Sequence, residues 1–142
     1  MKTAMIIASD AGARTAGIIR EELGKEVDLF SVSERSGCVR IDSITDFTLR
    51  HFGDYEAFVF IGAMGICVRA IAPCVTSKYA DPAVVNVDAT GHFVVSVLAG
   101  HVGGANALTE RLARILGAQP VVTTQSDNTG LWALDLLGKE NG

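Results

Sequence analysis

The first third of the chain alternates apolar runs with amphipathic segments. "KTAMIIAS" predicts a strand, and "TAGIIREELG" spaces Ile18, Ile19 and Leu23 as on a helix that ends at Gly24. "VDLFSV" predicts a second strand, whereas "SERSGCVRI" is irregular or a weak edge strand. "SITDFTLRHF" predicts a second helix, because Ser43 and Asp46 have the spacing of a capping box before an apolar face.

The rest of the chain repeats this alternation with one interruption. The connection "ATG" between two apolar strands is short enough for a β-hairpin. "YEAFVFIG" is continuously apolar, as expected where helices cover both faces of a sheet. The pattern therefore predicts a three-layer α/β/α sandwich, a mostly parallel sheet with one antiparallel hairpin. We expect strands over residues 57–61, 83–88, 93–98 and 120–124, and helices near residues 65–72 and 104–116.

Composition narrows the class of protein. A chain of 142 residues that is 49% hydrophobic can form one domain with a proper core. The net charge of -4 gives no basic surface for nucleic acid or anionic lipid, and no apolar run approaches the ~20 residues of a membrane helix. The N-terminal segment turns polar too early for a signal peptide, so we expect a cytoplasmic protein.

The cysteines and the C-terminal segment each carry one further expectation. Cys38, Cys67 and Cys74 form no C-x-x-C pair, so we expect reduced thiols and neither a disulfide framework nor a metal site. "LWALDLLG" resembles the opening of another helix that "KENG" cuts off. We therefore expect an α/β domain over residues 1–130 and the start of a linker or following region over residues 131–142.

Ligands of open α/β sheets bind at turns that follow strands, and the turn in "FIGAMGICVR" contains Gly62 and Gly65. It lacks the Lys-Ser/Thr of a phosphate loop and the third glycine of a dinucleotide fingerprint. The two glycines are equally consistent with a tight turn and close helix packing. Arg69 can bind a carboxylate, although a lone surface arginine is commonly just solvated.

A second turn, "GHVGGAN", places His101 among Gly100, Gly103 and Gly104. Histidine titrates near neutrality, so His101 suits a role as proton donor or acceptor. Two alternatives stay open: His101 hydrogen-bonds only its own loop, and Asn106 caps the next helix rather than binding a ligand.

A third group of polar residues follows the last strand, in "TTQSD". Thr123, Thr124, Ser126 and Asp127 offer hydroxyls and a carboxylate there. Taken by itself, the pattern favours the alternative that Ser126 or Asp127 merely caps a following helix. Asp88, at the end of "VVNVD", is an ordinary turn residue by type.

Residues 58–127 combine five motifs: G-x-x-G-I-x-V-R, K-x-x-D-P-A-V-V, V-D-x-x-G-x-F, S-x-L-x-G-H-x-G-G-A-N and T-T-x-x-D. With this combination the chain resembles the N-terminal domain of the cobalt-precorrin-5A hydrolase (CbiG) family of anaerobic cobalamin biosynthesis. Cys67 and Cys74 stand where ordinary aliphatic residues would be expected. Residues 1–57 agree with the family only in their βα layout.

The resemblance implies an enzyme that opens the δ-lactone of cobalt-precorrin-5A, gives cobalt-precorrin-5B and releases acetaldehyde. The cobalt arrives with the substrate, so no separate cofactor is implied. Family members usually continue into a C-terminal region, which is an expected partner together with other enzymes of the pathway. The alternative is that this domain only binds the tetrapyrrole or docks a partner domain, and that the C-terminal region catalyses the reaction. A generic phosphate- or nucleotide-binding module is a third and weaker alternative.

Residue chemistry suggests how such a substrate would be bound. A corrin precursor carries acetate and propionate groups around a flat apolar ring, and helix N-termini, glycine backbones and cations suit carboxylates. We expect His101 as general base, Asp88 as its helper, and the N–H groups of Gly103 and Gly104 as oxyanion donors. The expected substrate-binding residues are Gly62, Met64, Gly65, Arg69, Lys78, Gly100, Gly103, Gly104, Asn106, Thr123, Thr124 and Asp127.

Overall fold

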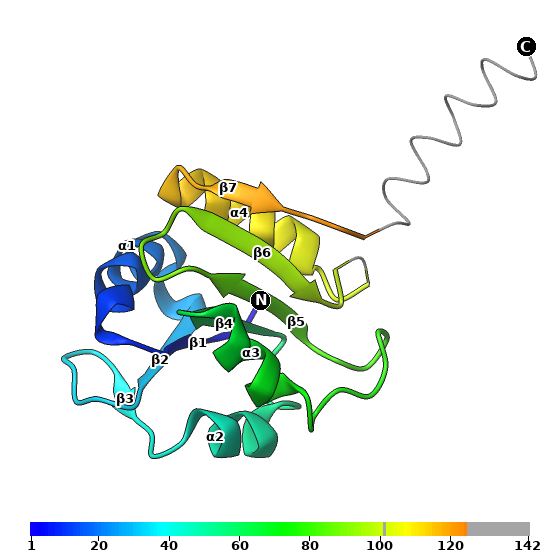
Figure 1. The fold of residues 1–142 in the computed structure, drawn as a ribbon, viewed down its shortest axis with the longest axis horizontal. Helices are drawn as coiled ribbons and strands as arrows, with labels where there is room; N and C mark the ends of the chain where they lie inside the picture. Colours follow the sequence, from blue (N-terminus) through cyan, green and yellow to red (C-terminus); the bar gives the residue numbers. More distant parts are fainter. Residues whose placement is uncertain (101, 125–142) are drawn as a thin grey trace, which may run out of the picture.

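The computed structural model describes residues 1–100 and 102–124 (Figure 1). Short 3-10 turns, Asp10–Gly12 and Gly24–Glu26, flank the first α-helix. The other elements are, in chain order, β1 (Thr3–Ile7), α1 (Ala13–Leu23), β2 (Val27–Ser31), β3 (Val39–Arg40), α2 (Ile44–His51), β4 (Ala57–Ile61), α3 (Met64–Ile71), β5 (Ala83–Val87), β6 (Phe93–Leu98), α4 (Ala105–Leu116) and β7 (Gln119–Val121).

The strands form one sheet in the order β3-β2-β1-β4-β5-β6-β7. Neighbouring strands are parallel except for β5 and β6, which pair antiparallel as a hairpin. The predicted fold class is therefore confirmed. β7 ends at Val121, earlier than the predicted residue 124, because the chain then leaves β6 and Thr124 is held by Asn106 instead.

Helices cover both faces of the sheet (Figure 1). Right-handed crossovers explain which face each helix takes. From β1 to β3 the chain adds strands on one side of β1, and from β4 on it adds them on the other side, so α2 and α3 lie on the face opposite α1. Because β6 runs antiparallel to β5, the next helix, α4, lies on the same face as α1. One core lies under α1 and α4 and includes Met5, Val59, Val85 and Leu112; the other lies under α2 and α3 and includes Ile6, Phe58, Phe60 and Cys67.

Helix ends follow the local sequence signals. The Ser43 hydroxyl accepts a hydrogen bond from the Asp46 N–H at 3.1 Å and caps α2, as predicted. α1 and α4 end at Gly24 and Gly117, which have φ of +59° and +65°. Glycine adopts such angles without steric cost, so both helices end where the sequence predicts.

The β5–β6 hairpin gives the sheet two edges at which strands end. Strands β1, β4 and β5 end at what we call the switch-point edge, formed by residues 8–12, 62–65 and 88–92. Strands β6 and β7 run the other way and end at the loop edge, formed by residues 76–82, 99–104 and 122–124. The five residues of β5 separate the two edges by roughly 16 Å.

Candidate functional site

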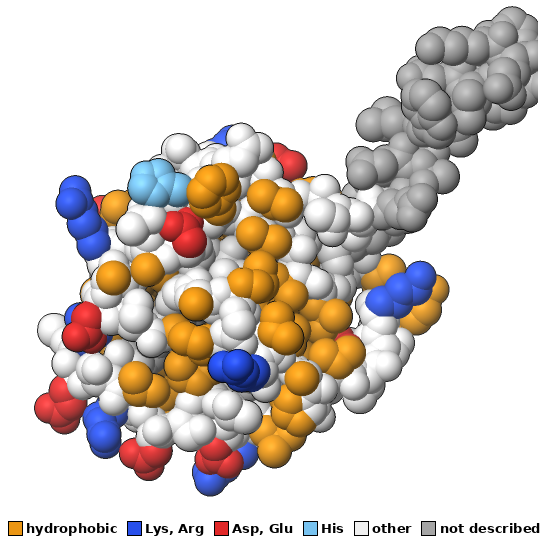
Figure 2. Space-filling model, in the orientation of Figure 1, with side chains coloured by type: hydrophobic (Ala, Val, Ile, Leu, Met, Phe, Trp, Pro, Cys, Tyr) orange, Lys and Arg blue, Asp and Glu red, His pale blue; other side chains and the backbone are white. Residues whose placement is uncertain are grey.

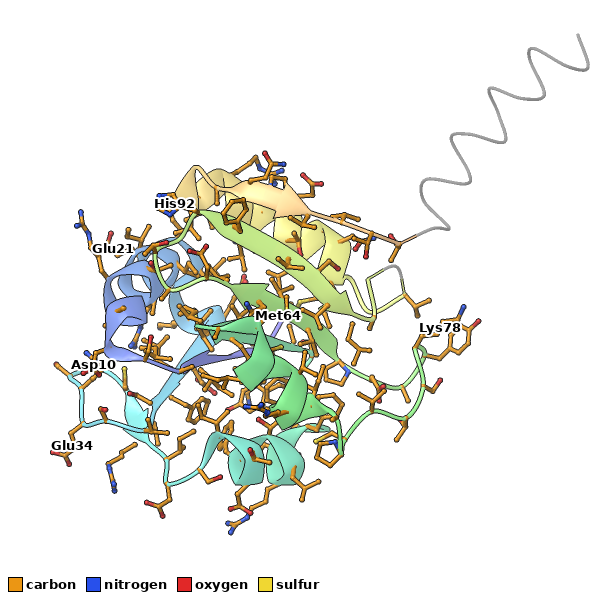
Figure 3. The ribbon with its side chains drawn as sticks, viewed as in Figure 1. Asp10, Glu21, Glu34, Met64, Lys78 and His92 are labelled. Atoms are coloured by element: carbon orange, nitrogen blue, oxygen red, sulfur yellow. The ribbon has the colours of Figure 1, made fainter. Side chains whose placement is uncertain are left out.

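The structure divides the predicted site residues between these two edges. Gly62, Met64, Gly65 and Asp88 belong to the switch-point edge, where β4 and β5 end. The loop edge holds Lys78, Gly100, Gly103, Gly104, Asn106, Thr123 and Thr124. Figure 3 shows the separation directly, because Asp10 and His92 lie at one end of the molecule and Lys78 at the other.

Three predicted residues belong to neither group. Arg69 is exposed in the last turn of α3, the end of that helix that leads toward the loop edge. His101 and Asp127 lie outside the described residues, as do the expected helix at residues 131–137 and the predicted boundary near residue 130.

Asn106 joins three segments at the loop edge. Its side-chain oxygen accepts a hydrogen bond from the Ser96 hydroxyl of β6 at 2.7 Å, and its amide nitrogen donates to the Thr124 hydroxyl at 2.7 Å. Its backbone N–H donates to the Gly100 carbonyl at 2.9 Å. The N-cap position of α4 is taken by Gly104, so the alternative that Asn106 caps the helix is wrong. Asn106 instead links the loop to β6 and to the segment after β7.

The glycines of this loop are required by its own close packing. A Cβ on Gly100 would lie 2.6 Å from the Asn106 side-chain oxygen, and one on Gly103 would lie 2.6 Å from the Ala99 Cβ. Gly104 has φ +86°, a left-handed conformation, and Ala99 has φ +55°. The loop thus has internal reasons for its glycines, in addition to any role in binding a ligand.

Asp81 organises the neighbouring segment that carries Lys78. Its buried carboxylate accepts hydrogen bonds from the N–H groups of Thr76 and Ser77 and from the Thr76 hydroxyl, at 2.7–3.2 Å. Lys78 lies 5.3 Å over the ring of exposed Tyr79. By residue type Asp81, followed by Pro82, is an ordinary turn residue, so its role was not apparent from the sequence.

The switch-point edge is closed by backbone packing. A Cβ on Gly62, where φ is +153°, would lie 2.7 Å from the Ala8 Cβ, and one on Gly12 would lie 2.7 Å from the Ile61 Cγ2. The buried Asn86 amide donates to the Gly62 carbonyl at 3.2 Å. Gly65 differs from these glycines, since nothing lies within 4 Å of its added Cβ.

Asp88 serves the hairpin turn that follows β5. Its carboxylate accepts hydrogen bonds from the N–H groups of His92 at 2.8 Å and Phe93 at 2.6 Å, and from the Thr90 hydroxyl. Burial alone would raise the pKa of Asp88, but the bonds from Thr90, Phe93 and His92 outweigh it and lower that pKa. The structure does not bring Asp88 to the loop of residues 99–104, because β5 lies between them. His92 is exposed.

The chain has clear relatives among known proteins. Residues 46–127 match the family model described as cobalamin synthesis G N-terminal, which is more than half of the chain. The chain belongs to this family. It is 56% identical over 86 residues to the "Cobalt-precorrin-5A hydrolase" of Salmonella typhimurium, and 47% identical over 91 residues to the protein of that name from Priestia megaterium. These stretches cover 61% and 64% of this chain.

The chain spans only 24% of the length of each of these two relatives. The fold agrees with a solved structure as well. The crystal structure of a cobalamin biosynthesis protein G homologue from Sulfolobus solfataricus superposes with a TM-score of 0.68 at 27% identity, over 85% of this chain and 36% of that one.

The segment matched by the cobalamin synthesis G N-terminal family includes turns at both edges, but it does not include a cavity beside β3. That cavity, of about 560 Å³, is lined by Glu34, Arg35, Ser36, Cys38 and Arg40. Sequence reasoning missed it, since "SERSGCVRI" shows no site pattern. Its two arginines already pair with the carboxylates of Asp10 and Asp42. The cavity therefore offers no concentrated charge to an ionic ligand.

Within the described residues, no group of three or more His, Cys, Asp or Glu side chains could hold a metal ion. Burial raises the pKa of the Cys67 thiol to about 12, so this thiol stays protonated and unreactive in the folded protein. No helix in the described part of the chain is long and apolar enough to cross a membrane.

Proposed function

We propose that this chain is the N-terminal part of an enzyme of anaerobic cobalamin biosynthesis. The enzyme opens the δ-lactone of cobalt-precorrin-5A, gives cobalt-precorrin-5B and releases acetaldehyde in the cytoplasm. The observation that carries the proposal is the 56% identity over 86 residues with a protein named cobalt-precorrin-5A hydrolase. Cobalt is part of the substrate, and no further cofactor belongs to the proposal.

We place the substrate at the loop edge. A net acidic protein binds a polycarboxylate only where donors and cations are concentrated. The first turn of α4, the backbone of Gly103 and Gly104, and Lys78 gather there, which supports this choice. Helix N-termini and exposed backbone N–H groups favour anions. Arg69 contributes a cation from the last turn of α3, whereas Met64, at the start of that helix, lies at the switch-point edge and takes no part.

His101 acts as the general base in this proposal. It takes a proton from the water that attacks the lactone carbonyl, and the N–H groups of Gly103 and Gly104 stabilise the oxyanion that forms. The ring C–O bond then breaks, and the leaving oxygen takes up a proton. Release of the two-carbon fragment needs proton transfer on a ring whose cobalt already withdraws electrons. Asp88 takes no part, because its carboxylate serves the hairpin turn at the other edge.

The test is an acetaldehyde assay with cobalt-precorrin-5A as substrate. The chain is assayed alone and together with the rest of the polypeptide that its longer relatives possess. We expect acetaldehyde from the complete enzyme. Acetaldehyde from the chain alone would assign the chemistry to this domain, whereas a complete enzyme that binds the substrate and forms none would contradict the proposal.

The second candidate is a module that binds the tetrapyrrole or docks the C-terminal region without catalysing the reaction. Its support is that the chain spans 24% of the length of two relatives named as hydrolases. Under this alternative, acetaldehyde formation survives substitution of His101 as long as the complete enzyme still binds substrate.

A further inference from the structure

One corner of the sheet has an apolar face that no described helix covers. Val94 belongs to the core under α4, and the Ser96 hydroxyl bonds Asn106 of α4. Side chains alternate along a strand, so Phe93 and Val95 point to the opposite face. On β7, Val121 is paired with Val95 and shares that face.

The same face continues toward α3. Val97 and Leu98 pack partly against the core under α2 and α3, beside the irregularity in the pairing of β5 with β6. Phe93 is 53% exposed, and Val68 on α3 is 48% exposed. Figure 2 shows hydrophobic side chains crossing the middle of this view, with most charged side chains toward the rim. We call Phe93, Val95, Val97 and Val121 the open face.

A buried polar group lies under the open face. Asn86 pairs with Val95 across the hairpin and is 4% exposed, yet its side-chain oxygen has no hydrogen-bond partner in the structure. A sheet of this class normally has helices on both faces, and large apolar patches mark contact surfaces. The open face is therefore expected to be covered.

We propose that residues 131–137 of this chain dock on the open face. The described chain ends at Thr124, three residues beyond β7, and β7 borders the open face. The six residues 125–130 can span roughly 20 Å when extended, about the length of β6. The docking segment can thus reach every residue of the open face.

The chemistry of the docking segment fits this surface. "LWALDLL" offers Leu131, Trp132, Leu134 and Leu137 and carries a single charge, on Asp135. Burial of each large apolar side chain in such a contact stabilises it by removing apolar surface from water. A charged partner gains nothing there, because the open face has no charged side chain. The proposal does not depend on the proposed enzymatic function.

Trp132 is the only tryptophan of the sequence, so its fluorescence reports on the docking segment. The experiment compares acrylamide quenching of the intact chain with that of a synthetic peptide of residues 125–142. We expect a quenching constant several-fold lower in the intact chain and a blue-shifted emission. Phe93→Asp should raise the constant to that of the peptide. Leu49→Asp is the matched control, since Leu49 is 55% exposed on α2, and it should leave the constant unchanged.

Leu134→Asp gives the same test from the other side of the contact. It alters no described residue, so circular dichroism should stay native while Trp132 becomes as accessible as in the peptide. Equal quenching of the intact chain and the peptide would overturn the proposal, as would an equal effect of Leu49→Asp. Protection that disappears on dilution would also overturn it, because the open face would then bind a second copy of the chain.

Discussion

The two edges of the sheet are closed in different ways. At the switch-point edge, Gly62 packs directly on Ala8, and the turn is fixed by backbone contacts. At the loop edge, one residue, Asn106, bonds β6 and the segment after β7 through its side chain and the loop through its backbone N–H. The general rule for open α/β sheets favours the first edge as a ligand site.

The antiparallel hairpin explains why this rule does not decide the matter here. Strands β6 and β7 also end in turns, but they end at the opposite edge from β4 and β5. A glycine-rich turn after a strand therefore occurs at both edges, at Gly62 and at Gly100. The strand direction, and not the turn sequence, determines which turns can share one ligand.

Gly103→Val should have the largest effect on stability. Its side chain would meet the Ala99 Cβ at 2.6 Å and the Ala99 carbonyl oxygen at 2.9 Å, and backbone cannot move aside cheaply. We expect a loss of about 3 kcal/mol in the free energy of unfolding, the upper range for an overpacked site. Urea denaturation measures it. A loss below about 0.5 kcal/mol would mean that the loop packs more loosely than described.

Asn106→Ala should destabilise the protein by about 2 kcal/mol, because the side-chain hydrogen bonds to Ser96 and Thr124 are lost at about 1 kcal/mol each. Ser43→Ala, which removes one helix cap on α2, should cost about 1 kcal/mol. Hydrogen exchange separates the two variants: only Asn106→Ala should speed exchange in residues 99–104. Faster exchange there in both variants would argue against Asn106 as the link of the loop edge.

Gly62→Ala and Gly65→Ala should change stability in opposite directions. Gly62 has no room for a Cβ, whereas Gly65 lies in α3 with open space around its added Cβ. We expect Gly62→Ala to cost about 1–3 kcal/mol and Gly65→Ala to stabilise by about 0.5–1 kcal/mol. Thermal unfolding gives both signs. A stabilising Gly62→Ala would contradict the close packing of the switch-point edge.

Asp88→Asn should have the smallest effect, and one that depends on pH. The pKa of Asp88 is lowered in the folded protein, so its contribution is complete above the unfolded pKa of about 3.9 and is lost as pH falls through the folded value. The variant should be less stable than the parent near neutral pH, and the gap should close in acid. Asp42→Asn serves as the exposed control. A stability difference between variant and parent that widens in acid would contradict the lowered pKa of Asp88.

The sequence predicted the layers, the hairpin and most element boundaries, because local patterns determine them. The apolar run "YEAFVFIG" and the cap at Ser43 needed no tertiary information. Local patterns could not predict which of the candidate site residues lie at which edge of the sheet. Asp88 follows β5 and Gly100 follows β6, and only the antiparallel pairing of these two strands puts the two turns at opposite edges. The link through Asn106 joins residues 10 and 18 positions apart, beyond the reach of helix or turn patterns.

The central claim is that substrate chemistry belongs to the loop edge and not to the switch-point edge. The most direct measurement is acetaldehyde release from cobalt-precorrin-5A by the complete enzyme carrying either His101→Ala or Asp88→Asn. We expect His101→Ala to lower the rate by about 10²–10⁴-fold with substrate binding retained, and Asp88→Asn to change it by less than about threefold. A full rate with His101→Ala, or an equal loss with Asp88→Asn, would contradict the account.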